Sequence, residues 1–211
     1  MQHARQDGEE TRQRILIAAT RVFGEKGFRD ATHAQICDLA EVNIASINYH
    51  FRSKSELYRT VWHEMMEDLD RKYPLGPIAE SNQPPERKVE SLIEAILRRS
   101  LDPELGTFQC LFMMEFHNPT GLVDDLLQER FAGYRKMLHC VLQEFAGGGA
   151  PEEQVELCEL SLMSQCRAVH IARQRQGKVC PPWQFTQDDL DRLKKHIAEF
   201  SLAGLTAILR K

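Results

Sequence analysis

Residues 32–51 read Thr-His-Ala-Gln-Ile-Cys-Asp-Leu-Ala-Glu-Val-Asn-Ile-Ala-Ser-Ile-Asn-Tyr-His-Phe, two short helical patterns separated by a three-residue turn. Thr32 is a typical N-cap, because its hydroxyl accepts a hydrogen bond from an amide of the first helical turn. It opens a pattern whose apolar members are expected on one side: Ile36, Leu39 and Ala40. Residues 41–43 interrupt the period, and Asn43 is suited to cap a second helix. The stretch therefore predicts a helix-turn-helix.

The second helix of this stretch has a buried and an outward face. Val42, Ile47 and Phe51 recur at the spacing that buries them against the first helix. An outward Ile44 or Ala45 could touch a thymine methyl, and Asn48 could pair with an adenine edge. Hydroxyl, imidazole and ammonium groups suit phosphates, as does the N-terminus of the helix that follows. The predicted DNA contacts are Thr32, Ile44, Ala45, Ser46, Asn48, Tyr49, His50 and Lys54. The alternative is a solvated helix in a helix-turn-helix used only for packing.

The end of this stretch resembles the TetR family of bacterial transcription regulators, whose DNA-binding unit ends in a tyrosine, a histidine or similar residue, a phenylalanine and a lysine. Here these are Tyr49, His50, Phe51 and Lys54. The resemblance covers roughly residues 9–60, including a preceding helix that Gly27-Phe28 closes and whose apolar face holds Ile15, Ala19, Val22 and Phe23. It implies a DNA-binding domain over residues 1–53 and a ligand-binding and dimerisation domain over residues 54–211, linked by the helix that begins at Lys54.

Two residues depart from the family pattern. Glu41 stands where a turn glycine is usual, and Cys37 where an alanine is usual. A residue other than glycine at positive φ costs on the order of 1 kcal/mol, which a packed three-helix unit tolerates. Glu41 could also tilt the second helix or repel a phosphate, so sequence preference is affected more than DNA binding itself.

Size and composition fit a protein of two domains or one large core. The chain has 211 residues, 42% of them hydrophobic, a net charge of −4, and no apolar run of about twenty residues. Residues 1–60 carry a charge of +1 and the remainder −5. The polar N-terminus lacks the apolar core of a secretion signal, so we expect a soluble cytoplasmic protein without membrane association. The six cysteines have no close pairing and are interpreted as reduced thiols, with Cys180 as an alternative redox-sensitive position.

Helical period continues through almost the whole chain after residue 9 and predicts an all-α protein of nine helices in two domains. An acidic cap at Asp7 with Glu10 three residues later places the first start near residue 9. Further helices are expected over residues 54–72, from about Val89 to Leu97, over 107–118, from Leu127 to Phe145, and over 152–175 and 188–210. Gly147-Gly-Gly149 should end the helix that Phe145 closes.

The last helix has two apolar stripes, one holding Leu190, Leu193, Ile197, Phe200 and Ile208 and the other Leu202, Leu205 and Leu209. Such a helix lies either inside a monomer's core or against a second copy. The resemblance favours a homodimer through the last two helices, which would present two recognition helices to a near-palindromic, double-stranded operator. Two dimers on one operator remain an alternative.

Soft apolar residues at 107–118 suggest an adaptable pocket, although ordinary core packing explains them equally. Residues 43–51, together with Ser164-Gln165-Cys166, resemble the CecR-type branch of the family, which implies an inducer cavity near Gln165. The predicted pocket residues are Trp62, Met65, Met66, Phe112, Met113, Phe116, His117, Tyr134, Gln165, Cys166 and His170. A metal held by Cys166 and His170, with Glu115 or His117, is the lesser alternative, and neither a metal nor a cofactor is predicted.

The leading hypothesis is a dimeric repressor that leaves its operator when a small organic ligand favours another conformer, a change carried by the helix at 54–72. An alternative is a DNA-binding or docking protein without an inducer, which a pocket too small for any ligand would favour. A helical enzyme is the least favoured reading, because the chain shows no nucleophile elbow, phosphate loop or metal-binding run, and no catalytic residue is predicted.

Overall fold

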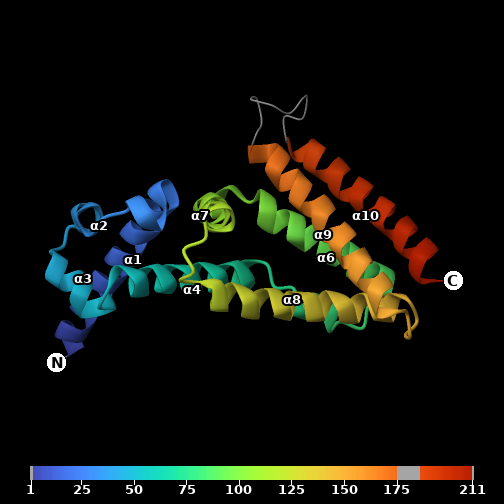
Figure 1. The fold of residues 1–211 in the computed structure, drawn as a ribbon, viewed down its shortest axis with the longest axis horizontal. Coiled ribbons are helices and arrows are strands. Elements are labelled where there is room, and N and C mark those ends of the chain that lie inside the picture. Colours follow the sequence, from blue (N-terminus) through green and yellow to red (C-terminus); the bar gives the residue numbers. More distant parts are fainter. Residues whose placement is uncertain (1, 175–185, 211) are drawn as a thin grey trace. The chain divides into compact units, whose positions relative to one another are not determined.

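A computed structural model describes residues 2–174 and 186–210 (Figure 1). Over these residues the chain is helical, with no β-strand and with nine helices of eight residues or more, so the predicted all-α, nine-helix class is confirmed. These helices are α1 (Gln2–Asp30), α2 (His33–Ala40), α3 (Ile44–Phe51), α4 (Lys54–Lys72), α6 (Pro85–Leu101), α7 (Gly106–His117), α8 (Asp124–Phe145), α9 (Glu152–Gln174) and α10 (Gln187–Leu209). A single turn, α5 (Gly76–Ala79), and a 3-10 turn, η1 (Pro103–Leu105), complete the elements.

The chain divides into two compact units. Unit 1 consists of Met1–Asp68 and Glu104–Gln128, and unit 2 of Leu69–Pro103 and Glu129–Lys211. Helices α4 and α8 each contribute residues to both units. The predicted functional boundary between residues 53 and 54 stays a prediction. The compact units divide elsewhere, because most of α4 and all of α7 pack with the N-terminal helices.

Unit 1 is built on α1, which packs against α2, α3 and α7. Its largest buried side chains come from five helices: Ile15, Phe23, Ile36, Ile47, Leu57, Tyr58, Trp62 and Leu111. Leu39 was expected in this core but is 45% exposed, whereas Cys37 is buried. At about 100° per residue, the buried face is centred near Ala40, with Ile36 about 40° and Cys37 about 60° from it, whereas Leu39 lies about 100° away. The buried face of α2 is therefore rotated toward Cys37 relative to the predicted one.

Helix α1 starts earlier than predicted but is closed at the predicted glycine. The helix begins at Gln2 rather than near residue 9, so the start predicted from Asp7 is wrong. Residues 2–6 include alanine, arginine and glutamine, which sustain a helix without the acidic cap, and the Thr11 hydroxyl donates to the Asp7 carbonyl at 2.8 Å, within the helix. The predicted closure is present as a kink, because Gly27 has φ 74° and ψ 175° before one last turn.

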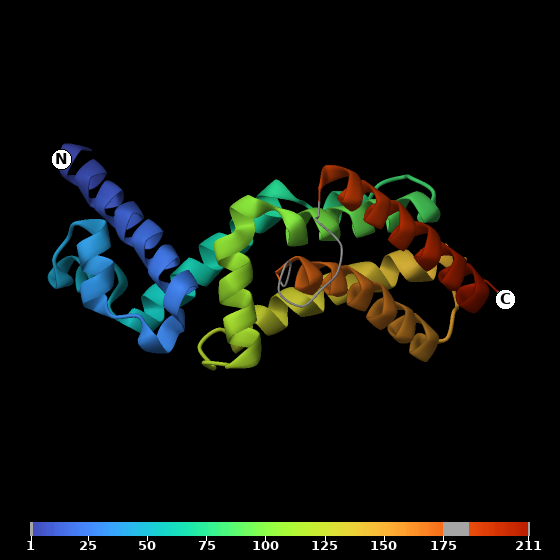
Figure 2. The ribbon, with the colours of Figure 1, turned by 90° about the horizontal axis from the view of Figure 1, so that it is seen from above.

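Unit 2 packs α6, α9 and α10 against one another (Figures 1 and 2). The C-terminal half of α8 packs in the same core. The buried residues of these four helices include Leu92, Leu97, Val141, Phe145, Val155, Leu162, Cys166, Ile197 and Leu205. Phe131, in the N-terminal half of the predicted α8 stripe, is 43% exposed. The helix ends as predicted at three glycines, because residues 147–149 all have positive φ, near 80°.

Helix α10 buries one stripe at intervals of four residues, Ile197, Ser201, Leu205 and Leu209. This stripe takes members from both predicted stripes, since a spacing of four keeps residues on one side of a helix. Phe200 (63%) and Ile208 (43%) are exposed, and the side chain of Leu190 lies outside the described residues. The helix therefore keeps an apolar surface outside its own core, as the double pattern suggested.

Candidate nucleic-acid interface and effector pocket

A side-chain cap fixes the start of each of the two helices in the helix-turn-helix. The Thr32 hydroxyl accepts from the Gln35 amide at 3.3 Å, and the Gln35 side chain accepts from the Thr32 amide at 3.1 Å, which completes a capping box. Asn43 accepts from the Ser46 amide at 2.9 Å. Between them Glu41 adopts φ 53° and ψ 48°, the left-handed conformation expected of a residue in the place of a turn glycine. The caps and this turn set the direction in which α3 leaves α2.

Helix α3 separates its faces as the sequence predicted. Ile47 and Phe51 are buried in the unit 1 core, while Val42, just before the helix, is half-buried. Ile44 is 55% and Tyr49 82% exposed. The rest of the predicted contact set is exposed or half-buried: Ala45, Ser46, Asn48 and His50. One face of α3 therefore presents small apolar groups, an amide, a phenol and an imidazole.

Two predicted DNA contacts also have a structural role within unit 1. The Ser46 hydroxyl donates to the capping oxygen of Asn43 at 3.2 Å, which uses its only proton. The Lys54 ammonium donates to the Ala31 carbonyl at 2.7 Å and lies 4.5 Å from the centre of the Phe28 ring. Lys54 therefore ties the end of α1 to the start of α4. Their contacts with DNA remain predictions.

Arg52 is a candidate contact that the sequence analysis missed. It follows α3 with φ 62°, its amide donates to the Asn48 carbonyl at 3.0 Å, and its side chain is exposed. The next residue, Ser53, accepts from the Glu56 amide at 3.1 Å and caps α4. A cation at this position and a capped helix N-terminus both favour a phosphate. The signal in the sequence was a basic residue immediately after the recognition helix.

The predicted effector residues are distributed over both units. Trp62 and Met66 are buried in the unit 1 core, where the Trp62 ring lies 5.7 Å from that of Phe108 and 6.3 Å from that of Phe112. Met65 packs against the same core, and Met113 is half-buried. At the end of α7, Phe116 is 60% exposed, and the exposed His117 contacts the Met113 carbonyl through Nδ1 at 2.7 Å. These unit 1 residues form an aromatic core with an exposed end, and their contact with an effector stays a prediction.

In unit 2 the remaining predicted pocket residues have separate surroundings. Gln165 donates from Nε2 to the Ser201 hydroxyl at 3.2 Å and so joins α9 to α10. Cys166 is buried, and burial raises the pKa of its thiol to about 12, which keeps it protonated near neutral pH. The side chain of His170 lies outside the described residues, as does Cys180. Among the described residues no group of three His, Cys, Asp or Glu is placed to hold a metal.

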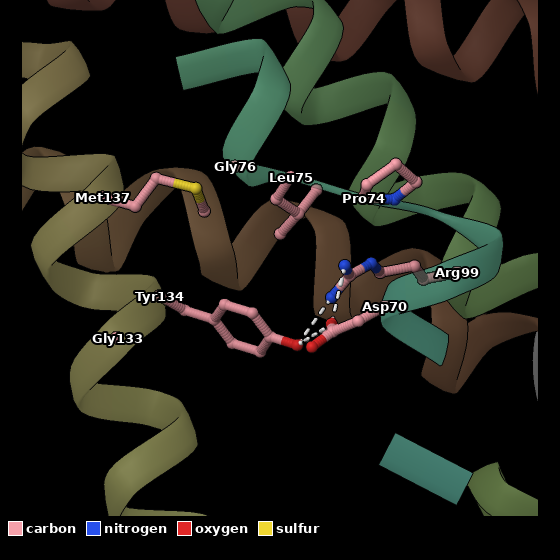
Figure 3. Close-up of a pocket in the computed structure, with 8 residues that line it drawn as sticks. All are labelled: Asp70, Pro74, Leu75, Gly76, Arg99, Gly133, Tyr134 and Met137. Carbon is pink, nitrogen blue, oxygen red and sulfur yellow. Dashed lines mark hydrogen bonds and ion pairs between the residues drawn. The ribbon is translucent and has the colours of Figure 1, made fainter. Parts of the chain in front are cut away.

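Tyr134 lines a pocket of about 180 Å³ in unit 2 (Figure 3). The other lining residues come from α4, α5, α6, α8 and the segment before α5: Asp70, Pro74, Leu75, Gly76, Arg99, Gly133 and Met137. The Asp70 carboxylate accepts from the Tyr134 hydroxyl at 2.7 Å and from Arg99 at 3.1 Å, and it also pairs with Arg130. Figure 3 shows Asp70, Arg99 and the Tyr134 hydroxyl on one side and the side chains of Leu75 and Met137 on the other.

Burial raises the pKa of the Tyr134 phenol, and the hydrogen bond to Asp70 acts in the same direction. Arg99 is itself buried. It donates hydrogen bonds to the backbone carbonyl of Tyr73 and to the Asp70 carboxylate. These contacts hold the last turn of α4 against α6 and α8. The pocket therefore lies beside a charged group that fixes the end of α4, a residue set that sequence spacing did not reveal.

The fold and the exposed face of α3 define a helix-turn-helix protein of the kind that inserts a recognition helix into the major groove of DNA. Comparisons with known proteins narrow this class. Residues 15–61 match the family model for bacterial regulatory proteins of the tetR family. Residues 85–205, more than half of the chain, match the C-terminal domain of the HTH-type transcriptional dual regulator CecR. The chain belongs to the TetR family of transcriptional regulators and has a CecR-type C-terminal domain.

Similar proteins are named as transcriptional regulators. The HTH-type transcriptional regulator AcrR of Shigella flexneri is 25% identical over 204 residues, 93% of this chain and 88% of that protein. SrpR of Pseudomonas putida is 28% identical over 137 residues, which cover 65% of this chain and 62% of that protein. A TetR-like regulator from Rhodococcus sp. RHA1 shares the fold with a TM-score of 0.68 at 17% identity, over 93% of this chain and 96% of that one. In the described residues, no helix has the length and apolar character needed to cross a membrane.

Proposed function

We propose that this regulator is a dimeric repressor that binds a near-palindromic operator through α3 and is released from it by a small organic effector. The observation that carries the DNA-binding part is the double-capped helix-turn-helix, which exposes Ile44, Asn48 and Tyr49 on one face of α3. Asn48 pairs with an adenine edge, and Ile44 and Ala45 contact thymine methyls. Such a protein acts on chromosomal DNA, and hence in the cytoplasm.

The phosphate contacts come from the ends of the same elements. Arg52 after α3 supplies positive charge, and the His50 imidazole and the capped N-terminus of α4 supply N–H donors close to the exposed face of α3. Thr32 stands at the N-terminus of α2, where a phosphate also meets free amides. Glu41 opposes this arrangement with an exposed negative charge in the turn. Affinity should therefore depend on salt and rise when Glu41 loses its charge.

Dimerisation is proposed through the outer faces of α9 and α10. Apolar side chains on these helices are exposed in the single chain: Leu157 (57%), Leu160 (65%), Met163 (37%), Ile171 (38%), Phe200 (63%) and Ile208 (43%). An exposed apolar surface of this kind marks an interaction site, and a two-fold axis lets one face pair with its own copy. Two copies then offer two α3 helices about 34 Å apart, one helical turn of DNA.

The proposed DNA contacts are tested by measuring the affinity of the purified protein for DNA at a series of salt concentrations. The two DNAs compared are a fragment from upstream of its own gene and scrambled DNA of equal length. We expect a preference of roughly a thousandfold or more for the specific DNA. Asn48→Ala should cost about 1–3 kcal/mol on the operator and little on scrambled DNA. Arg52→Gln should weaken both and reduce the salt slope by about 1, whereas Lys195→Gln, an equal charge change on exposed α10, should alter neither.

The dimer is tested separately by light scattering and by the same DNA assay. Leu160→Asp places a charge on the proposed interface and should give a monomer with weakened operator binding. Ile17→Asp is the matched control, because Ile17 is 63% exposed on α1 and lies outside that interface. A Leu160→Asp protein that stays dimeric would contradict the proposed interface, and equal affinity of wild type for both DNAs at every salt concentration would contradict the proposed operator.

A further inference from the structure

The pocket in unit 2 has room for one small ring. Its volume is about 180 Å³, below the 300–1,000 Å³ of sites for drug-sized ligands but above the roughly 150 Å³ of an apolar cavity that holds benzene. Pro74, Leu75 and Met137 form its apolar lining, and Asp70, Arg99 and Tyr134 its polar lining (Figure 3). Such a site accepts a molecule with one apolar portion and one polar head.

The charges beside the pocket favour an anionic head. The guanidinium groups of Arg99 and Arg130 both contact the Asp70 carboxylate, and Arg99 lines the pocket. Arg99 is only 9% exposed, so an anion that reaches it is poorly screened by water. A guanidinium also binds a carboxylate through two parallel hydrogen bonds, which gives it geometric selectivity for this head group.

We propose that the pocket binds a small monocarboxylic acid with a single ring or short alkyl chain, whose carboxylate takes the place of Asp70 on Arg99. The apolar portion of the acid packs against Leu75 and Met137. The exchange leaves Arg99 paired throughout, so the buried cation is never left without an anion. A neutral molecule of the same shape cannot make this exchange.

This inference rests on the proposed function, because it names the effector class and the group that the effector displaces. Asp70 lies in the last turn of α4, and its bonds to Arg99, Arg130 and Tyr134 fasten that turn to α6 and α8. A ligand carboxylate on Arg99 loosens this fastening. The helix that receives the signal is the one that also carries Lys54 and the Ser53 cap at its other end.

The test is calorimetric titration of the full-length wild-type protein at pH 7 with benzoate and with benzamide, its uncharged analogue. We expect benzoate to bind at least tenfold more tightly. Asp70→Asn removes the internal competitor and should increase benzoate affinity several-fold, whereas Arg99→Gln should decrease it at least tenfold. Asp125→Asn, the same change in an ion pair of unit 1, should have no effect. A purely structural role for the group predicts weaker binding in both pocket variants, so the opposite signs are diagnostic.

Equal affinity for benzoate and benzamide, or no binding of either, would overturn the proposed ligand class even if Arg99→Gln failed to fold. Weaker benzoate binding by a folded Asp70→Asn protein would overturn the exchange. Benzoate is then added to the protein–operator complex. Binding without release would support the pocket and contradict the repressor mechanism, whereas release by another compound with no benzoate binding would refute the pocket chemistry and leave the proposed function standing.

Discussion

The buried hydrogen bond between Tyr58 and Glu115 allows a quantitative test of how α4 and α7 are held together. The Tyr58 hydroxyl donates to Glu115 Oε2 at 2.8 Å, and Glu115 Oε1 accepts from the Thr120 amide at 2.7 Å and from its hydroxyl at 2.8 Å. Tyr58 is 1% and Glu115 3% exposed. The substitution Tyr58→Phe removes one donor and leaves the ring, which packs against Phe23 at a centroid distance of 5.0 Å.

The expected loss of unfolding free energy is about 1.5–3 kcal/mol, the usual value of a hydrogen bond to a charged group. The value should lie toward the lower end, because two donors from Thr120 still satisfy Glu115. For a chain of this size each kcal/mol corresponds to roughly 2–4 °C in the midpoint of thermal unfolding. The measurement is urea unfolding followed by circular dichroism, with Tyr49→Phe as the matched control, because Tyr49 is 82% exposed and the same atom is deleted.

The stability contributed by the Tyr58 hydroxyl should also depend on pH. Burial, and to a lesser extent the neighbouring Glu115 carboxylate, raises the pKa of the Tyr58 phenol above its ordinary value of 10.0. The folded state therefore holds this proton more tightly than the unfolded chain. Its contribution is complete below about pH 10 and is lost as the pH rises above that value. Wild type should lose stability more steeply than Tyr58→Phe above pH 10. Equal stability of Tyr58→Phe and Tyr49→Phe at pH 7, or parallel pH profiles, would refute this account.

Four other substitutions have expected outcomes. Glu41→Gly removes a left-handed residue with a side chain and should stabilise the protein by up to about 1 kcal/mol in urea unfolding; no gain would mean that the turn is unstrained. In Gly133→Ala the added Cβ meets no atom within 4 Å, so the free energy of unfolding should rise by about 0.5–1 kcal/mol. Gly24→Ala should raise it less, because the added Cβ would lie 2.4 Å from a methyl carbon of α7. Equal gains in the two variants would contradict that close approach. The hydrogen bond from Arg59 holds the pKa of Asp125 at about 2, so this pair stabilises the fold above about pH 4 and loses its effect as the pH falls toward 2. In Arg59→Gln the pKa of Asp125, followed by NMR, should return toward 3.8, and an unchanged value would refute the pairing.

Local chemistry explains the parts of this protein that were predictable from its sequence. Thr32 and Asn43 cap their helices as expected, α4 runs from Lys54 to Lys72 as expected, and Ile47 and Phe51 are buried beneath an exposed face of α3. Caps and helical period involve residues within one or two turns of each other, so spacing along the chain is sufficient to recognise them. The division of α3 into a buried and an exposed face was predictable for the same reason.

Contacts between distant segments were decided only by the tertiary structure. Asp70, Arg99 and Tyr134 come from three helices, and nothing in the spacing of residues 70, 99 and 134 indicates that they share hydrogen bonds. Conversely, Trp62 and Cys166 were assigned to one pocket but are buried in the cores of different units. Soft apolar residues have the same period in a core as around a cavity, so the sequence does not show which neighbours they meet. The sequence alone determined the class of protein and the capped helix that we propose reads DNA, and the packing of α4, α6 and α8 determined where the unit 2 pocket lies.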